Sequence, residues 1–161
     1  MTPLALDEYD GLSICEVIGS GAAAVLQEAG LPVPESAQTA LPHGAGLVAC
    51  TGRDDYLVVS EAEELPATAP PPWLLARSDQ VLRLRGEGWE EAMTQLCPHD
   101  LRRLPEGGWL AASVAGVSAW LYRHPGVPDG ILLGFDPSYG TYLRAMLEAV
   151  VHDHRHAPDN T

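Results

Sequence analysis

Several short segments of the sequence carry residue types that could do chemistry. Cys97-Pro98-His99-Asp100 places a thiol, an imidazole and a carboxylate side by side, which are the groups of an activated cysteine nucleophile. Nucleophile and base usually come from distant segments, whereas here Pro98 can end a helix and Asp100 can cap the next turn. A catalytic Cys97 would also need exposure and a positive neighbour such as Arg102 or Arg103. The segment therefore favours a structural role.

An alternating histidine tract lies near the C-terminus. His152, His154 and His156 carry imidazole nitrogens that could bind a divalent metal. The tract follows the last expected helix and precedes a polar tail, so we interpret it as a frayed terminus. A small hydrolase or metal enzyme that uses Cys97 or these histidines is the least favoured class.

Gly19-Ser20-Gly21 resembles the start of a dinucleotide-binding fingerprint, because it follows an expected strand and opens an expected helix. The fingerprint also requires a parallel strand that ends in a ribose-binding acid. Here the helix leads into Leu31-Pro32-Val33-Pro34-Glu35, a proline-bound loop, so close helix–strand packing explains the glycines better. We assign no catalytic, cofactor-binding or metal-binding residue in this chain.

Tryptophans offer a separate signal, because a large aromatic side chain is either core or contact surface. Trp89 and Trp120 fall on apolar faces of their expected elements and are predicted to be core. If Trp73 or Trp109 is exposed, a protein interface is indicated.

Composition limits the class of protein. The chain has 161 residues, 46% of them hydrophobic, which suits one domain spanning 1–161. It carries 22 acidic and 9 basic residues, a formal charge of −13, which argues against nucleic acid and membrane surfaces as partners. Acidic residues near the start and the lack of a long apolar run predict a cytoplasmic protein. Its three scattered cysteines indicate neither disulfides nor a zinc site.

Hydrophobic periodicity predicts the same order of elements twice. Each half, about 11–60 and 73–151, begins with a strand, a Gly-x-Gly and a helix, and continues with two strands. A proline-rich spacer, 61–72, separates them, and a strand over 130–135 and a helix from about 138 to 151 close the chain. The expected fold class is α+β, with two βαββ-type units and mostly antiparallel sheets. The elements of the two units are 12–18, 20–29, 46–50 and 56–60, then 80–85, 87–96, 109–114 and 117–123.

The order of several motifs resembles the sarcosine oxidase gamma family, the gamma subunits of heterotetrameric sarcosine oxidase, which includes the small subunit of N-methylglutamate dehydrogenase-like complexes. The resemblance covers nearly the whole chain, and Cys97-Pro98-His99-Asp100-Leu101 matches a Cys-Pro-x-Asp-Leu signature. Ala112-Ser113 stands where members often carry Arg-Thr, which leaves open the particular amine-oxidising complex. The other supporting segments are Gly30-Leu31-Pro32, 51–59, Arg77-Ser78-Asp79, 82–86, 120–123 and 139–150.

The resemblance implies a fold like the folate-binding domain of the glycine-cleavage aminomethyltransferase. It also implies a small, non-catalytic assembly subunit that works with a large (alpha) and a flavin-bearing (beta) subunit. Those partners are expected to hold FAD, FMN, NAD and tetrahydrofolate and to demethylate an N-methyl amine such as sarcosine. The alternative is a stand-alone folate-binding protein, with a pocket between the halves and an acidic group on the pterin.

Overall fold

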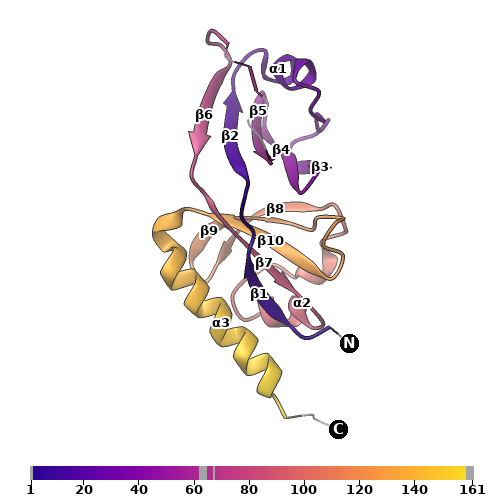
Figure 1. Ribbon diagram of the computed structural model, residues 1–161. Helices are drawn as coiled ribbons and strands as arrows, with labels where there is room; N and C mark the ends of the chain where they lie inside the picture. The colour runs from indigo at the N-terminus through magenta and orange to yellow at the C-terminus, as the bar shows by residue number, and fades with distance from the viewer. Residues whose placement is uncertain (1, 62–64, 67, 159–161) are drawn as a thin grey trace.

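Two five-stranded antiparallel sheets make up most of the fold (Figure 1). The computed structural model describes residues 2–61, 65–66 and 68–158, so residues 62–64 and 67 of the expected spacer lie outside the described part. The first sheet has the order β3 (Thr39–His43), β4 (Gly46–Gly52), β5 (Asp55–Ser60), β2 (Ser13–Ile18) and β6 (Trp73–Arg77). The second has the order β1 (Ala5–Glu8), β7 (Gln80–Arg85), β10 (Gly130–Phe135), β9 (Val117–Tyr122) and β8 (Trp109–Val114).

The helices are few and lie on the outer faces of the sheets. α1 (Ala22–Glu28) packs on the first sheet, and α2 (Trp89–Met93) and α3 (Gly140–His156) pack on the second. Short 3-10 turns, η1 (Leu101–Arg103) and η2 (Pro137–Tyr139), complete the elements. The predicted α+β class with mostly antiparallel sheets is confirmed. Among the described residues, no helix combines the length and apolar composition needed to cross a membrane.

One outer strand of each sheet comes from the other half of the chain. β1 begins the sequence but pairs with β7, with Leu6 opposite Leu84, whereas β6 follows the spacer but pairs with β2, with Leu74 opposite Val17. Figure 1 shows these two strands beside their partners, with the chain crossing between the sheets after β1 and after β6. The first sheet therefore extends across the spacer into the second half, and the second sheet combines β1 from the start of the chain with strands from its later part.

The repeated Gly-x-Gly turns have the same backbone geometry in both units. Gly19 and Gly86 have φ of 112° and 113°, and Gly21 and Gly88 have φ of 87° and 86°. The carbonyl of the first glycine accepts a hydrogen bond from the amide three residues on, at 3.1 and 3.3 Å. Left-handed backbone of this kind favours glycine, so the repeated motif encodes a repeated turn into the helix.

Alternation along the strands separates three packed layers of apolar side chains. One layer lies between α1 and the first sheet, and another lies between the second sheet and the helices α2 and α3. The central layer joins the two sheets face to face, and its large members include Trp109, Trp120, Tyr122, Leu57 and Leu132. Because both sheets bury both faces over much of their length, burial holds the two units together.

A glycine makes room for the central tryptophan. Gly134 lies opposite Trp120 in the β10–β9 register, and a β-carbon built on Gly134 would lie 1.9 Å from Trp120 Cε2. Trp120 is buried, so its ring has little freedom to move away. The small residue at position 134 thus fixes where the indole lies.

We expect Gly134→Ala to lower the free energy of unfolding by about 1–3 kcal/mol, because overpacking displaces the Trp120 ring. Gly52→Ala is the matched control, since its β-carbon would lie 3.9 Å from Asp55 Cβ, an ordinary contact. Urea unfolding followed by tryptophan fluorescence measures both variants. Equal stability of the two variants would contradict this account of Trp120.

An ion pair links β1 to β7, its neighbour in the second sheet. Asp7 Oδ2 accepts hydrogen bonds from Arg85 Nε at 3.0 Å and from Arg83 Nη2 at 3.1 Å. The hydrogen bond from Arg85 is the main reason that the pKa of Asp7 falls below 3.8, with desolvation opposing it and Arg83 adding to the lowering. Asp7 therefore stays ionised at neutral pH and favours the folded state.

The pKa of Asp7 is lower in the folded state than in the unfolded state, so ionised Asp7 stabilises the fold. This stabilisation is fully present above the unfolded-state pKa of about 4 and is lost as the pH falls through the folded-state pKa. We expect Asp7→Asn to cost up to about 1 kcal/mol at neutral pH, a small figure because solvent screens a pair this exposed. Urea titrations from neutral to acidic pH should show the two proteins converging. A difference that stays constant down to about pH 2 would exclude this pair as the cause.

Candidate functional site

A cleft of about 460 Å³ opens between the two sheets. Its wall on the first sheet includes Glu16, Asp55 and Arg77, and its wall on the second sheet includes Trp109 and Trp120. The same strand faces meet in the central core further along, so the cleft is the place where the two sheets diverge. Smaller cavities of about 270 and 390 Å³ lie elsewhere, beside α3 and beside η1.

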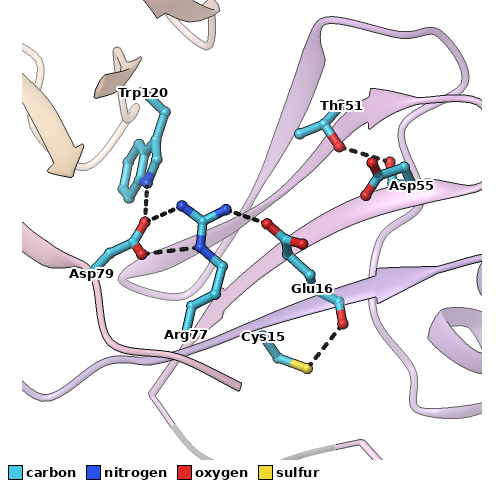
Figure 2. Close-up of polar contacts among 7 residues, drawn as sticks. All are labelled: Cys15, Glu16, Thr51, Asp55, Arg77, Asp79 and Trp120. Atoms are coloured by element: carbon cyan, nitrogen blue, oxygen red, sulfur yellow. Dashed lines mark hydrogen bonds and ion pairs between the residues drawn. The ribbon is translucent and has the colours of Figure 1, made fainter. Parts of the chain in front are cut away.

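A charged network forms part of the cleft wall (Figure 2). Arg77 donates to Asp79 through Nε at 3.0 Å and through Nη2 at 2.7 Å, and its Nη1 donates to Glu16. Trp120 Nε1 donates to Asp79 Oδ2 at 3.1 Å. Arg77 and Glu16 belong to the first sheet, Trp120 belongs to the second, and Asp79 lies where the chain crosses between them. The network therefore ties the sheets together.

The hydrogen bonds of this network keep the guanidinium of Arg77 charged. The Asp79 side chain is only 6% exposed, and a buried carboxylate needs a compensating charge and hydrogen bonds. Burial alone would lower the pKa of Arg77, but the hydrogen bonds to Asp79 and Glu16 outweigh it and raise that pKa. The guanidinium thus provides a permanent positive charge at Asp79.

We expect Arg77→Met to lower the free energy of unfolding by about 1–3 kcal/mol, because it leaves the Asp79 carboxylate with the indole of Trp120 as its remaining donor in this network. Arg102→Met is the matched control, since Arg102 makes a similar two-pronged contact with Asp100 at the protein surface. The control should unfold like the wild type. Urea unfolding midpoints measure both variants. An Arg77→Met protein as stable as the control would show that the Arg77–Asp79 contact does not stabilise the packing of the two sheets.

The cleft carries a strong negative charge. Asp55 and Asp136 join Glu16 and Asp79 around the single guanidinium of Arg77, which gives these five groups a formal charge of −3. A backbone hydrogen bond from Ser138 lowers the pKa of Asp136, so this carboxylate is ionised at neutral pH. Within the described lining there is no histidine, cysteine or lysine to act as a nucleophile or base. The arrangement suits attraction of cationic groups.

The Cys97 segment has a structural role in the fold. Cys97 is 5% exposed and packs in the core below the second sheet, whereas His99 and Asp100 face solvent. Asp100 caps η1 by accepting from the Arg102 amide at 3.2 Å. Burial of the thiol is inconsistent with the exposure that a catalytic Cys97 requires, and the predicted capping by Asp100 is confirmed.

The expectation of a frayed histidine tract is wrong, because α3 continues through His156. The rings of His152 and His156 stack with centroids 4.3 Å apart on one helix face. His154 lies on the opposite side, where a β-carbon on Gly88 would lie 2.3 Å from its Nε2. Helical spacing separates His154 from the other two, and the described residues contain no cluster of three metal-ligating side chains.

The glycine turn before α1 is covered by prolines. A β-carbon on Gly19 would lie 3.6 Å from Pro71 Cβ, and one on Gly21 would lie 3.6 Å from Pro72 Cδ. The strand after α1 is antiparallel to its neighbour, unlike the parallel strand of a dinucleotide-binding unit. The structure therefore supports close packing at these glycines, as the sequence favoured.

The tryptophans separate clearly into core and surface. Trp89 and Trp120 are buried, which confirms their predicted core positions, and Trp109 is buried as well. Trp73 is 58% exposed, and Leu75, two residues further along β6, is 46% exposed. Strand periodicity places both side chains on one face of β6, so the exposed tryptophan belongs to a small apolar surface. Sequence reasoning named Trp73 as a candidate but missed the strand that carries it.

The fold and the cleft define an α+β domain with two five-stranded antiparallel sheets packed face to face, in which three strands follow the helix of each unit where the predicted βαββ pattern has two. No protein-family model matches the chain, and no curated protein matches its sequence. Among solved structures, it is similar to a chain of the heterotetrameric sarcosine oxidase from Corynebacterium sp. U-96 in complex with pyrrole 2-carboxylate. The TM-score is 0.83 at 18% identity, and the match covers 96% of this chain and 87% of that chain. The likeness establishes a shared fold.

Proposed function

We propose that this chain is a small, non-catalytic assembly subunit of a heteromeric flavin-dependent amine oxidase or dehydrogenase of the sarcosine oxidase kind. The observation that carries the proposal is the fold likeness over 96% of this chain to a chain of an oxidase described as heterotetrameric. The order of sequence motifs leads to the same gamma subunit class. The complex would oxidatively demethylate an N-methyl amine such as sarcosine and pass its carbon to tetrahydrofolate.

The distribution of polar groups supports an assembly role. The charged network of Arg77 and Asp79 holds the sheets together, and Asp100 caps a turn. The apolar surface of Trp73 and Leu75 on β6 is instead exposed to solvent, where a partner could bury it. A subunit of this kind stabilises a complex by burying surface and by mass action. In this proposal the FAD, FMN, NAD and tetrahydrofolate belong to the alpha and beta partners.

We expect the affinity-tagged chain, expressed in its native host, to elute as a yellow assembly of several chains with flavin absorbance. Size-exclusion chromatography with multi-angle light scattering and a visible spectrum would measure this. Amine-dependent reduction of the flavin, tested with sarcosine, would identify the activity. A colourless, monodisperse species near 17.2 kDa would contradict the subunit function.

That negative outcome would direct attention to the alternative, stand-alone folate binding in the cleft between the sheets. Calorimetric titration of the isolated chain with tetrahydrofolate separates the two functions. Micromolar binding that Asp55→Asn weakens would favour a folate-binding protein, whereas an absence of binding together with a flavin-containing assembly favours the subunit.

A further inference from the structure

The outer strand of the first sheet presents an unusual edge. β6 pairs with β2 on one side, and in the described part of the chain no strand covers its other side. Natural edge strands are commonly protected by charges, prolines or bulges. β6 carries Trp73, Leu74, Leu75 and Ala76 before its first charge at Arg77. Its backbone therefore remains available for pairing with another strand.

The opposite edge of the same sheet, β3, carries the kind of protection that is common in edge strands. β3 contains Pro42, which lacks an amide hydrogen and interrupts strand pairing. Leu41, at 40% exposure, is the large exposed apolar side chain there. β6 combines free backbone with two neighbouring exposed apolar side chains, so it is the better docking edge.

Charge indicates what kind of partner fits β6. Leu75 lies opposite Glu16 in the strand register, and Glu16 belongs to the group of five charged residues with a formal charge of −3. A second copy of this chain would bring together two proteins of formal charge −13, which electrostatic repulsion opposes. A strand bearing arginine or lysine would instead meet complementary charge.

We propose that β6 binds an extended basic segment of a partner subunit, which adds to the first sheet as a sixth strand. Its apolar side chains cover Trp73 and Leu75, and its cationic side chains lie near Glu16 and the cleft carboxylates. Backbone pairing supplies binding energy, and the alternating side chains supply specificity. This inference rests on the proposed function and adds the surface and the chemistry of the partner.

The docking chemistry can be tested on the whole chain with a synthetic peptide that alternates valine and arginine. We expect it to slow hydrogen–deuterium exchange at residues 73–77 and to bind more weakly as salt rises. A peptide that alternates valine and glutamate should not bind. Trp73→Ser/Leu75→Ser should weaken binding by about tenfold or more, because truncating a central aromatic anchor removes much of the binding energy.

Leu41→Ser, on the opposite edge, is the matched control and should bind the arginine peptide like the wild type. The substituted side chains are exposed, so all variants should keep the wild-type urea midpoint. Equal binding of the two peptides, or protection away from residues 73–77, would overturn the proposal. A homodimer that Trp73→Ser/Leu75→Ser dissociates in sedimentation would also overturn it, since a second copy would then occupy β6.

Co-purification from the native host distinguishes failure of this inference from failure of the proposed function. If the wild type and the Leu41→Ser variant recover the flavin assembly but Trp73→Ser/Leu75→Ser elutes alone, both proposals hold. If the double variant still recovers the assembly, β6 is not the docking edge, although the subunit function stands. A wild-type chain that elutes alone, yet binds the arginine peptide at β6, would overturn only the subunit function.

Discussion

The two crossings of the chain between sheets are the constraint on which the rest of the structure depends. β1 completes the second sheet and β6 completes the first, so the second sheet needs both the start and the later part of the chain, and the first sheet needs the strand that follows the spacer. At the second crossing, the buried carboxylate of Asp79 accepts from Arg77 on one side and from Trp120 on the other. A residue in the connection thus joins both sheets, and its burial makes the charge of Arg77 necessary.

The same constraint explains the cleft. Near the start of β4, His124 lies between the sheets: its Nδ1 accepts from the Gly126 amide, so its Nε2 carries the hydrogen and donates to Gly46 O at 3.0 Å. Tyr9 donates to Ala45 O at 2.8 Å in the same region. At the other end of β4, Thr51 lines the cleft. The sheets therefore approach closely at one end and diverge at the other, where the wall charges stay partly hydrated.

Sequence reasoning located the strands in which apolar and polar residues alternate and the helices that follow the glycine turns, because those signals are local. It missed β1, which has only four residues, β3, which contains Pro42, and β6, which follows a run of prolines and depends on pairing with the distant strand β2. The Arg77–Glu16 pair spans 61 positions, and the contact of Trp120 with Asp79 spans 41. No local pattern encodes such contacts, so the residues that line the cleft could not be predicted, although the folate-binding alternative expected a pocket between the halves.

β6, the outer strand of the first sheet, links this architecture to the proposed function. Its inner side pairs with β2, and Arg77 at its end takes part in the tie between the sheets. Trp73 and Leu75 on the same strand remain largely exposed, although Trp109 and Trp120 are buried. Exposed apolar surface next to a strongly charged cleft has no stabilising use within the isolated fold, because water would favour its burial. The strand that closes the first sheet is thus also the part of it best suited to extend the sheet into a partner.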